Sequence, residues 1–375
     1  MKVVIATASR IHPPASCPAA RVHAIAAYCA RNGFETIVLS PYQQLDPLEL
    51  EWQRRKFDSA FYTHNRRFHR IWNFSFLAAL ARQVRRRNTC VIVEHPGLGA
   101  MVHFLSRILR FPYILDEHTI RFTSLKLRGK EFAAKLFYPV EKFLWRKAAA
   151  VLVVAHHEGL LIKARTGKEP LLVPNGVDID RFAPREKDRD LLAHLGLAQC
   201  KIVLFSGNFD LPLNARAAAV INDVIAPKVY EKRDDVRFVL VGKNPPHLNY
   251  HPSVMATGYV RDKETYIGVA DLVIAPFEGY VGTRPVILEA MASGKTVISS
   301  FLGAKGLAVE NGREIVLCAI NDFPARICAH LDGAASGAMP PAARVKALDY
   351  DWELILNPLK KFLNGGGDDA GSKKT

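Results

Sequence analysis

Short uninterrupted runs of apolar residues recur along this chain, and they constrain its fold more than any other feature. Ten such runs are separated by segments long enough to form helices; they fall at 2–8, 35–40, 89–94, 112–117, 150–155, 170–175, 201–207, 236–242, 271–277 and 295–300. Continuous Val/Ile/Leu runs of this length are typical of strands buried on both faces, as in parallel sheets covered by helices. The alternation therefore predicts an α/β protein with two doubly wound parallel-sheet domains.

The length of 375 residues agrees with two domains. We expect an N-terminal domain over 1–170 and a C-terminal domain over 171–349, followed by a terminal helix over 350–363 and a disordered tail over 364–375. The segment 128–150 is predicted to be a long amphipathic helix with lysines on one side. Its other side carries Phe132, Leu136, Phe137, Val140, Phe143 and Leu144.

Several classes of protein are disfavoured by what the chain lacks. No apolar run reaches the roughly 18–20 residues of a membrane span. Met1 leads directly into the strand-like KVVIATAS, without the pattern of a signal peptide. The six cysteines are scattered without a C-x-x-C pair, which predicts reduced thiols and no zinc site. We therefore expect a cytoplasmic protein without a bound metal.

The positive charge is concentrated in the first 150 residues. The whole chain carries a net charge of +15, and residues 1–150 hold 24 lysines and arginines against 10 aspartates and glutamates. The densest basic stretch runs from Arg54 through HNRRFHR (64–70) to RQVRRR (82–87). Such a surface attracts nucleic acid, an anionic membrane face or a phosphorylated lipid, unless it is only a solvated basic face.

Two strands of the second half end in glycine followed by a polar residue. Gly207 precedes Asn208, and Gly242 precedes Lys243. In open parallel sheets, ligands bind beyond the carboxyl ends of the strands, and a glycine there lets a phosphate approach the backbone. The alternatives are a glycine that serves only helix–strand packing and an ordinary exposed lysine.

A third strand end, FEGYVGTRPVILEAMASG, has the composition of an anion site. Pro285 suits the first position of a helix, so the amides of Gly282, Thr283 and Arg284 would face an anion at the positive end of that helix. Arg284 adds a forked donor that matches phosphate oxygens. Glu289, about one turn further, can accept hydrogen bonds from two vicinal hydroxyls. Diphosphate and ribose sites together indicate a nucleotide.

The chain resembles the family-4 retaining glycosyltransferases of GT-B architecture. The resemblance rests on the order and spacing of NGVD (175–178), SGNFDLPLNARA (206–217), VRFVLVGKNPP (236–246), TGYVRDKETYIGVADLVIAPF (257–277) and GTRPVILEAMASGKTVISSFLGAKGL (282–307). It implies two Rossmann-like domains facing across a cleft, the first binding the acceptor and the second the nucleotide sugar. The terminal helix around Trp352 is expected to cross back to the first domain.

The resemblance also implies roles for single residues. The donor would be a UDP- or GDP-linked sugar, with Glu289 on the ribose, 282–284 on the diphosphate and the chain from Tyr259 through Val260 to Arg261 along the base. His118 in LDEHT would lie near the transferred sugar. The remaining implied or predicted site residues are Gly207, Asn208, Lys243 and Glu278 on the donor side, and Pro14, Ser16 and Arg21 of the first loop and helix on the acceptor side.

The sequence departs from the family pattern at several positions. Val281 stands where many members have a second glutamate, and Glu278 stands three residues before that position. Val286 replaces a common lysine, and Asn208 stands where arginine and lysine are usual. The diphosphate would therefore depend mainly on Arg284, with Lys243, Arg216 or Lys305 as helpers. A weakened or inactive homologue is an alternative.

The expected reaction is metal-independent transfer of a sugar to an acceptor hydroxyl with retention of configuration. No Asp-x-Asp suited to a metal clamp lies beside the predicted site, so Arg284 and the loop amides would stabilise the leaving group while His118 binds the sugar. We expect the acceptor to be a glycan or a lipid-linked saccharide, and the basic domain to contact an anionic membrane at its inner face. Nucleic acid is not expected as a partner. The alternatives are a GT-B-like sugar-nucleotide epimerase and a basic nucleic-acid-binding protein.

Overall fold

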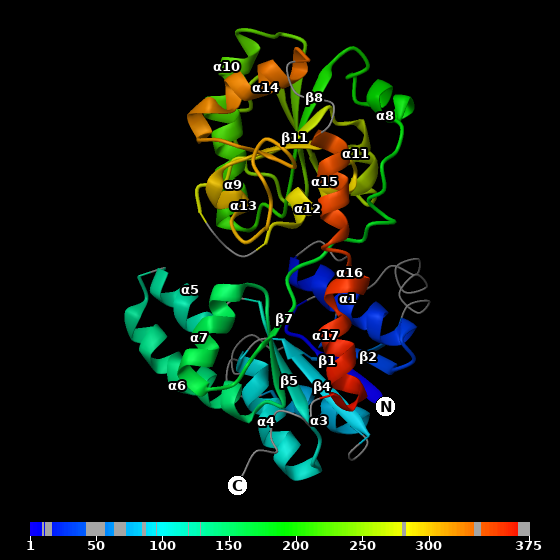
Figure 1. Cartoon of the computed structure of the whole chain (residues 1–375), viewed down its shortest axis with the longest axis vertical. Coiled ribbons are helices and arrows are strands. Elements are labelled where there is room, and N and C mark those ends of the chain that lie inside the picture. Colours follow the sequence, from blue (N-terminus) through cyan, green and yellow to red (C-terminus); the bar gives the residue numbers. More distant parts are fainter. Residues whose placement is uncertain are drawn as a thin grey trace. The chain divides into compact units, whose positions relative to one another are not determined.

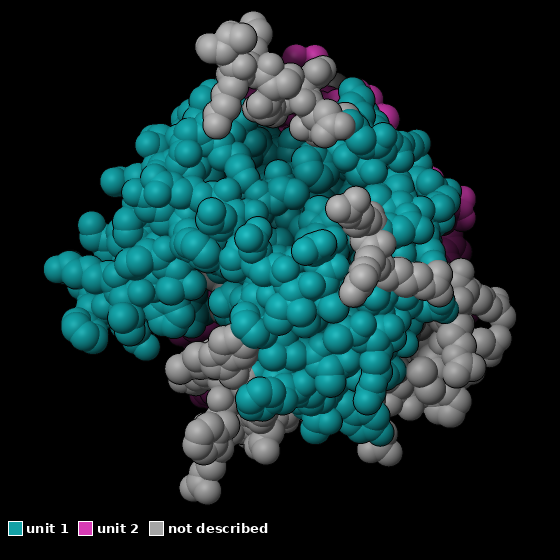
Figure 2. Space-filling model, turned by 90° about the horizontal axis from the view of Figure 1, so that it is seen from below, with its two compact units in different colours: residues 1–174, 352–375 teal, residues 175–351 magenta. Residues whose placement is uncertain are grey.

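The computed structural model divides the chain into two compact units, which Figure 2 distinguishes by colour. Unit 1 comprises residues 1–174 and 352–375, and unit 2 comprises residues 175–351. The structure describes residues 1–9, 11, 17–42, 57–63, 73–84, 88–94, 96–118, 120–127, 129–279, 283–333 and 339–366.

Unit 1 contains a parallel sheet of seven strands in the order β3-β2-β1-β4-β5-β6-β7 (Figure 1). The chain moves outward from β1 to β3 and then resumes with β4 on the other side of β1. This reversal is the topological switch point at which ligands of such sheets bind. The strands are β1 (Lys2–Ala6), β2 (Glu35–Pro41), β3 (Asp58–Tyr62), β4 (Thr89–Glu94), β5 (Tyr113–Glu117), β6 (Ala150–Val153) and β7 (Leu171–Leu172).

The helices of unit 1 cover this sheet. They are α1 (Cys17–Arg31), α3 (Phe74–Gln83), α4 (Pro96–Leu109), α5 (Arg121–Leu127), α6 (Glu131–Lys147), α7 (His156–Thr166), α16 (Trp352–Ile355), α17 (Asn357–Lys361) and η3 (Phe362–Gly366). The last three follow the whole of unit 2 in the chain, yet α16 packs on α1 and α17 packs on β7. Tyr28 of α1 donates a hydrogen bond to the amide oxygen of Asn357 at 3.0 Å. The end of the described chain therefore belongs to the core of unit 1.

Unit 2 repeats the same strand order with six parallel strands, β10-β9-β8-β11-β12-β13. Its switch point lies between β8 and β11, where Leu272 is in register with Val203. The strands are β8 (Lys201–Ser206), β9 (Val236–Val241), β10 (Val254–Gly258), β11 (Leu272–Ala275), β12 (Thr296–Ser299) and β13 (Val316–Leu317). The two parallel sheets confirm the predicted α/β class with two doubly wound domains.

The helices of unit 2 include one continuous helical stretch, in which α9, η1 and α10 follow each other without a break. The helical segments of unit 2 are α8 (Arg189–His194), α9 (Pro212–Val220), η1 (Ile221–Ile225), α10 (Ala226–Tyr230), α11 (Lys263–Val269), α12 (Pro285–Ala292), α13 (Phe301–Ala304), η2 (Ile320–Asp322), α14 (Phe323–Leu331) and α15 (Met339–Leu348).

Among the described residues of the whole chain, no helix is both long and apolar enough to cross a membrane.

Three strands were missed by the sequence prediction, and all three lie at an edge of a sheet. β3 and β10 end their sheets on one side and β13 ends the second sheet on the other. Most residues of β3, β10 and β13 are only half buried. An edge strand has a neighbour on one side alone, so it needs no continuous apolar run and leaves a weaker signal in the sequence.

Candidate functional site

The carboxyl ends of β8 and β9 meet through backbone atoms. Gly242 has φ +148°, and a Cβ atom there would lie 1.8 Å from the carbonyl oxygen of Gly207. The amide of Gly242 donates a hydrogen bond to the carbonyl of Gly258 at 2.9 Å, and the amide of Gly207 donates one to the carbonyl of Val241 at 3.0 Å. Only glycine fits at 242. The absence of side chains at these glycines therefore lets the backbones at the ends of β8 and β9 approach each other closely.

Arg284 is held rigidly at the beginning of α12. It occupies the N-cap position with φ −97° and ψ 113°, and Pro285 follows as the first helical residue. Its guanidinium lies over the ring of Phe277 at 3.9 Å from the ring centre, and Nη2 donates to the carbonyl of Gly279 at 3.0 Å. Stacking and hydrogen bonding together fix the plane of the cation beside the helix N-terminus.

Thr283 joins this helix start to the first residue of unit 2. Its hydroxyl accepts a hydrogen bond from the amide of Asn175 at 3.3 Å, and its carbonyl accepts one from Nδ2 of the same residue at 3.4 Å. Both side chains are buried. The NGVD turn therefore supports the loop before α12 instead of standing alone as a turn.

Glu289 of α12 has one carboxylate oxygen that is paired and one that is not. Its Oε1 accepts a hydrogen bond from Nζ of Lys263 at 2.6 Å. Its Oε2 is buried, and no hydrogen bond reaches that atom from the residues the structure describes. A buried carboxylate oxygen without a donor costs about 1–3 kcal/mol or more, so a ligand hydroxyl at this atom would recover that loss.

Two of the other cations expected near a diphosphate, Arg216 and Lys243, are paired with carboxylates. Arg216 of α9 donates from Nε to Oε2 of Glu278 at 2.6 Å, and Nζ of Lys243 lies 3.8 Å from Oδ2 of Asp210. All four side chains are well exposed. Exposed pairs of this kind are worth less than about 1 kcal/mol, so a bound phosphate could exchange with either carboxylate at little cost.

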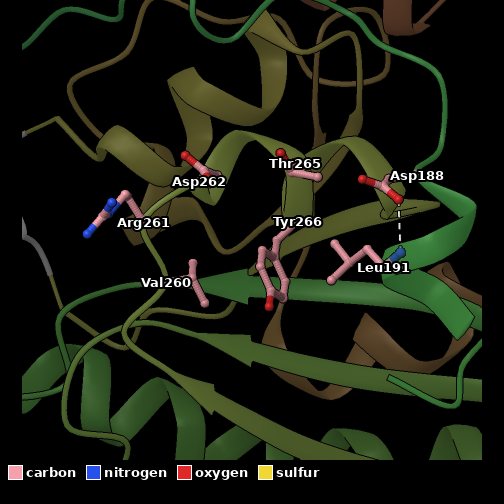
Figure 3. A pocket seen from close by; sticks show the side chains of 7 residues that line it. All are labelled: Asp188, Leu191, Val260, Arg261, Asp262, Thr265 and Tyr266. Atoms are coloured by element: carbon pink, nitrogen blue, oxygen red, sulfur yellow. Dashed lines mark hydrogen bonds between the residues drawn. The ribbon is translucent and has the colours of Figure 1, made fainter. Parts of the chain in front are cut away.

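The chain after β10 borders a cavity of about 420 Å³, shown in Figure 3. The carbonyl of Arg261 accepts a hydrogen bond from Nη2 of Arg181 at 3.4 Å, which holds this turn. Tyr259, the third predicted residue of the turn, is 48% exposed. In Figure 3 the ring of Tyr266 stands at the centre of the labelled side chains. The lining residues are Asp188, Leu191, Val260, Arg261, Asp262, Thr265 and Tyr266.

In unit 1, His118 lies at the carboxyl end of β5 between two carboxylates. Its Nε2 is 3.0 Å from Oδ2 of Asp116, and its Nδ1 is 3.5 Å from Oε1 of Glu94. Glu94 also accepts a hydrogen bond from the hydroxyl of Thr7 at the end of β1. The ends of β1, β4 and β5 thus meet at the switch point of the sheet, and the histidine is oriented by both neighbours.

Arg21 completes this cluster from α1. Its guanidinium is fully buried and binds both carboxylate oxygens of Asp116, the nearest pair at 2.8 Å. Nη1 donates to the carbonyls of Val173 and Pro174 at 2.8 and 3.0 Å. The side chain therefore ties α1, β5 and the chain after β7 together, and its predicted contact with an acceptor remains a prediction.

The charges of this cluster shift one another's pKa. Burial by itself would raise the pKa of Asp116, but Arg21 and His118 outweigh that effect and hold it well below its usual range. Burial by itself would lower the pKa of His118, but Asp116 and Glu94 outweigh it and raise the pKa. The geometry therefore favours an ionised Asp116 and a histidine that keeps its proton longer than a free one.

Three more carboxylates of unit 1, two buried and one half-buried, have raised pKa values, and sequence reasoning missed them. Glu117 accepts a hydrogen bond from the indole of Trp145, and burial followed by the Glu141 charge raises its pKa. Burial raises the pKa of Glu141 and of Glu158 to about 7 in each case. A signal in the sequence was present for Glu117 alone, because PYILDE ends a buried strand with carboxylates, whereas Glu141 and Glu158 lie in helices.

Some predicted positions lie outside the described residues. They are Pro14, Ser16 and Gly282, together with Val281 and most of the lysines and arginines between Arg54 and Arg87. Val286, which replaces a lysine of the family pattern, is buried in α12. Within the described ranges, no group of three or more His, Cys, Asp and Glu side chains is arranged to hold a metal ion.

Two family models match the chain, one in each unit. The model described as "Glycosyl transferase 4-like domain" matches residues 17–176, and the model described as "Glycosyl transferases group 1" matches residues 200–334. With two Rossmann-like sheets of the same strand order, the molecule has the architecture of a GT-B glycosyltransferase. The chain belongs to the family-4 glycosyltransferases of GT-B fold, as its sequence predicted.

Individual proteins agree with this assignment. The phosphatidyl-myo-inositol mannosyltransferase of Mycobacterium tuberculosis is 26% identical over 215 residues, and that match spans about half of each protein, 52% of this chain and 54% of the relative. The Mycolicibacterium smegmatis protein of the same name is 25% identical over 275 residues, covering 70% of this chain and 67% of the relative.

Solved structures show the same fold at lower identity. Sucrose-phosphate synthase from Thermosynechococcus elongatus superposes with a TM-score of 0.75 at 16% identity, covering 98% of this chain and all of that one. HepE of Anabaena, solved in complex with UDP and glucose, gives a TM-score of 0.75 at 16% identity and covers 97% of this chain and all of that one.

Proposed function

We propose that this protein transfers a sugar from a nucleotide diphosphate to an acceptor hydroxyl. The observation that carries the proposal is Oε2 of Glu289, a buried carboxylate oxygen without a donor in the described part of unit 2. It lies one turn inside the helix whose N-terminus presents Arg284. A ribose hydroxyl on Glu289 and a diphosphate at Arg284 suit one nucleotide. Membership of a glycosyltransferase family adds the sugar.

In the proposed reaction, the bond between the anomeric carbon and the diphosphate oxygen breaks while the acceptor oxygen bonds to the same carbon. The acceptor proton passes to the leaving phosphate oxygen, and the configuration is retained. Arg284 and the amides at the start of α12 stabilise the charge that develops on the diphosphate, so no metal is required. The predicted role of His118 near the transferred sugar stays a prediction, because both of its ring nitrogens face carboxylates of unit 1.

We further propose a UDP- or GDP-linked hexose as the donor and a glycan or lipid-linked saccharide as the acceptor. The mannosyltransferase relatives support a phosphorylated lipid as the class of acceptor, because phosphatidyl-myo-inositol is named in their description. The excess of positive charge in residues 1–150 agrees with a protein that works against an anionic membrane from the cytoplasmic side.

A panel of UDP-, GDP- and ADP-sugars in a thermal-shift assay tests the donor site. One class of donor should raise the melting temperature of the wild type, and Glu289→Gln should lose most of that shift. Glu231→Gln is the matched control, because Glu231 is an exposed glutamate of the same unit at the end of α10. A donor that stabilises Glu289→Gln as well as the wild type would rule out the assigned ribose contact.

The chemistry has separate readouts. With the donor identified, proton NMR of the product should show the anomeric configuration of the donor. Transfer should continue at the same rate in excess EDTA. An inverted product would contradict retention, and loss of activity that returns with Mg²⁺ or Mn²⁺ would contradict metal independence.

A further inference from the structure

The helix α6 exposes an apolar stripe that no described element of unit 1 covers. Phe132, Leu136, Val140 and Phe143 are 84%, 66%, 42% and 46% exposed. Their spacing of four, four and three residues places them on one face of the helix. The opposite face packs into the unit through Ala134, Glu141, Leu144 and Trp145.

The stripe continues onto the neighbouring helix α4. The ring of His103 in α4 contacts that of Phe143 edge-on, with centroids 5.0 Å apart. Both helices belong to unit 1, where α4 packs against α6 (Figure 1). We call His103, Phe132, Leu136, Val140 and Phe143 the α4–α6 face.

Cations surround this face. They are Arg107, Arg110, Lys135, Lys142, Arg146 and Lys147. All are exposed except Lys142, which is half-buried. None of them forms an ion pair within the described part of the chain. The carboxylate of Glu141 points inward and accepts hydrogen bonds from the amides of Arg121 and Phe122. On α6, Glu131 alone places an exposed acidic side chain among them.

The apolar side chains of this face, together with the cations beside them, indicate which partner it binds. Single exposed apolar residues are common, but aromatic and aliphatic side chains grouped within a basic border mark a binding surface. Lysine and arginine can extend their charged ends to lipid phosphates while the apolar side chains enter the acyl boundary. A second copy of the chain docking through this same face would bring like charges together.

We propose that the α4–α6 face binds the surface of an anionic bilayer, with Phe132 and Leu136 entering the headgroup region. The proposal locates the membrane contact of the proposed function on particular helices, and it rests on that function only for the choice of acceptor. The contact orients unit 1 toward a lipid-linked acceptor. It uses α4 and α6 in addition to the basic stretch that the sequence pointed to.

Vesicle flotation with the full chain tests this surface. The wild type should float with vesicles of phosphatidylcholine and phosphatidylglycerol and remain free with phosphatidylcholine alone, and high salt should weaken the binding. The double variant Phe132→Ser/Leu136→Ser should bind at least about tenfold more weakly. Val345→Ser/Leu348→Ser is the matched control, because both residues are exposed on α15 of unit 2 at 66% and 40%.

The charged border has a test of its own. Lys135→Glu/Arg146→Glu should reduce binding to anionic vesicles by a similar factor and remove most of the salt dependence. Equal binding of both double variants and the wild type would overturn the proposal, as would failure of the wild type to bind. A dimer of the free wild type that Phe132→Ser/Leu136→Ser dissociates would assign the face to a second copy instead. Tighter retention on DNA than on vesicles would assign it to nucleic acid.

Donor binding separates this inference from the proposed function. The Phe132→Ser/Leu136→Ser variant should keep the thermal shift produced by the nucleotide sugar, since both residues lie in unit 1 and the donor residues lie in unit 2. A wild type that floats with anionic vesicles but ignores every nucleotide sugar would contradict the donor site and leave the membrane surface intact.

Discussion

The carboxyl edges of the two sheets have the same topology and opposite chemistry. At the switch point of unit 1, buried side-chain charges fill the edge, with Arg21, Asp116, His118 and Glu94 in one connected cluster. At the switch point of unit 2, glycine backbone forms much of the edge, and Arg284 stands beside it. The strand order creates an edge where a ligand can bind, and the residues placed there decide what that edge can do.

The edge of unit 1 holds a side chain in a fixed orientation, whereas the edge of unit 2 offers a place for a ligand. A diphosphate needs amide donors and space, which bare backbone at a helix N-terminus supplies. A histidine that contacts a sugar needs a fixed ring and a defined proton, which neighbouring carboxylates supply. The two edges therefore respond differently to mutation, and four changes test that contrast, from the largest expected effect to the smallest.

Removing the central carboxylate of unit 1 should have the largest effect. Asp116→Asn leaves the fully buried Arg21 without its ionic partner and should lower the free energy of unfolding by about 3–5 kcal/mol. Tryptophan fluorescence during urea unfolding follows unit 1 selectively, because all four tryptophans of the chain lie in it.

The control for this change is Asp58→Asn, an exposed aspartate at the start of β3. It should alter the same transition by no more than about 0.5 kcal/mol. If both variants unfold together, the cluster does not stabilise unit 1 and the contrast between the two edges fails.

The bare backbone of unit 2 is tested by adding one methyl group. Gly242→Ala would place a Cβ atom against the carbonyl of Gly207 and should cost roughly 2–4 kcal/mol. Gly312→Ala also has a positive φ, but nothing lies within 4 Å of its Cβ, so it should cost only about 1–2 kcal/mol.

Far-UV circular dichroism should register the loss in both alanine variants, whereas the tryptophan signal of unit 1 should not. The difference between the variants isolates the steric contact from the backbone strain. Equal melting of the two would mean that the close approach of β8 and β9 tolerates a side chain.

The fork of Arg284 is tested by a change that keeps its charge. Arg284→Lys loses the planar contact with Phe277 and the paired donors, and should weaken nucleotide-sugar binding about tenfold in titration calorimetry. Arg313→Lys, at an exposed pair with Glu310, should leave the affinity unchanged. If the Arg284→Lys variant binds the nucleotide sugar as tightly as the wild type, Arg284 contributes only its charge.

The smallest effect concerns the proton of His118. Because Asp116 and Glu94 raise its folded pKa, its contribution to stability is complete below the unfolded pKa of about 6.5 and is lost as the pH rises through the folded value. Asp116 acts in the other direction, since its lowered pKa gives stability that is lost only as the pH falls into the acid range.

NMR titration of the His118 ring should show a pKa above that of a free histidine. Glu94→Gln should lower this pKa and reduce the pH dependence of stability by about 1 kcal/mol or less. Arg21 and Glu158 also face this charge, and both remain in the variant. A pKa that Glu94→Gln leaves unchanged would remove Glu94 from the residues that position the histidine.

The fold class and the family were predictable because their signals are local and repeated. Buried parallel strands require continuous apolar runs, and the block around Arg284 and Glu289 has a fixed spacing within a strand, a turn and a helix. The edge strands β3, β10 and β13 were missed, because a half-buried strand has no such run. Arg21 and His118 were predicted as separate site residues, but Asp116 and Glu94 were missed, because the members of this cluster come from two strands and one helix.

The sequence by itself determined two α/β domains, the family and the helix start that presents Arg284. Tertiary structure alone decided which charges meet, because residues as distant as Arg21 and Asp116 become partners only when α1 packs beside β5. It also decided that the apolar stripe of α6 faces outward. A helical pattern defines a face, but only the packing of Leu144 and Trp145 shows which face is turned to the core.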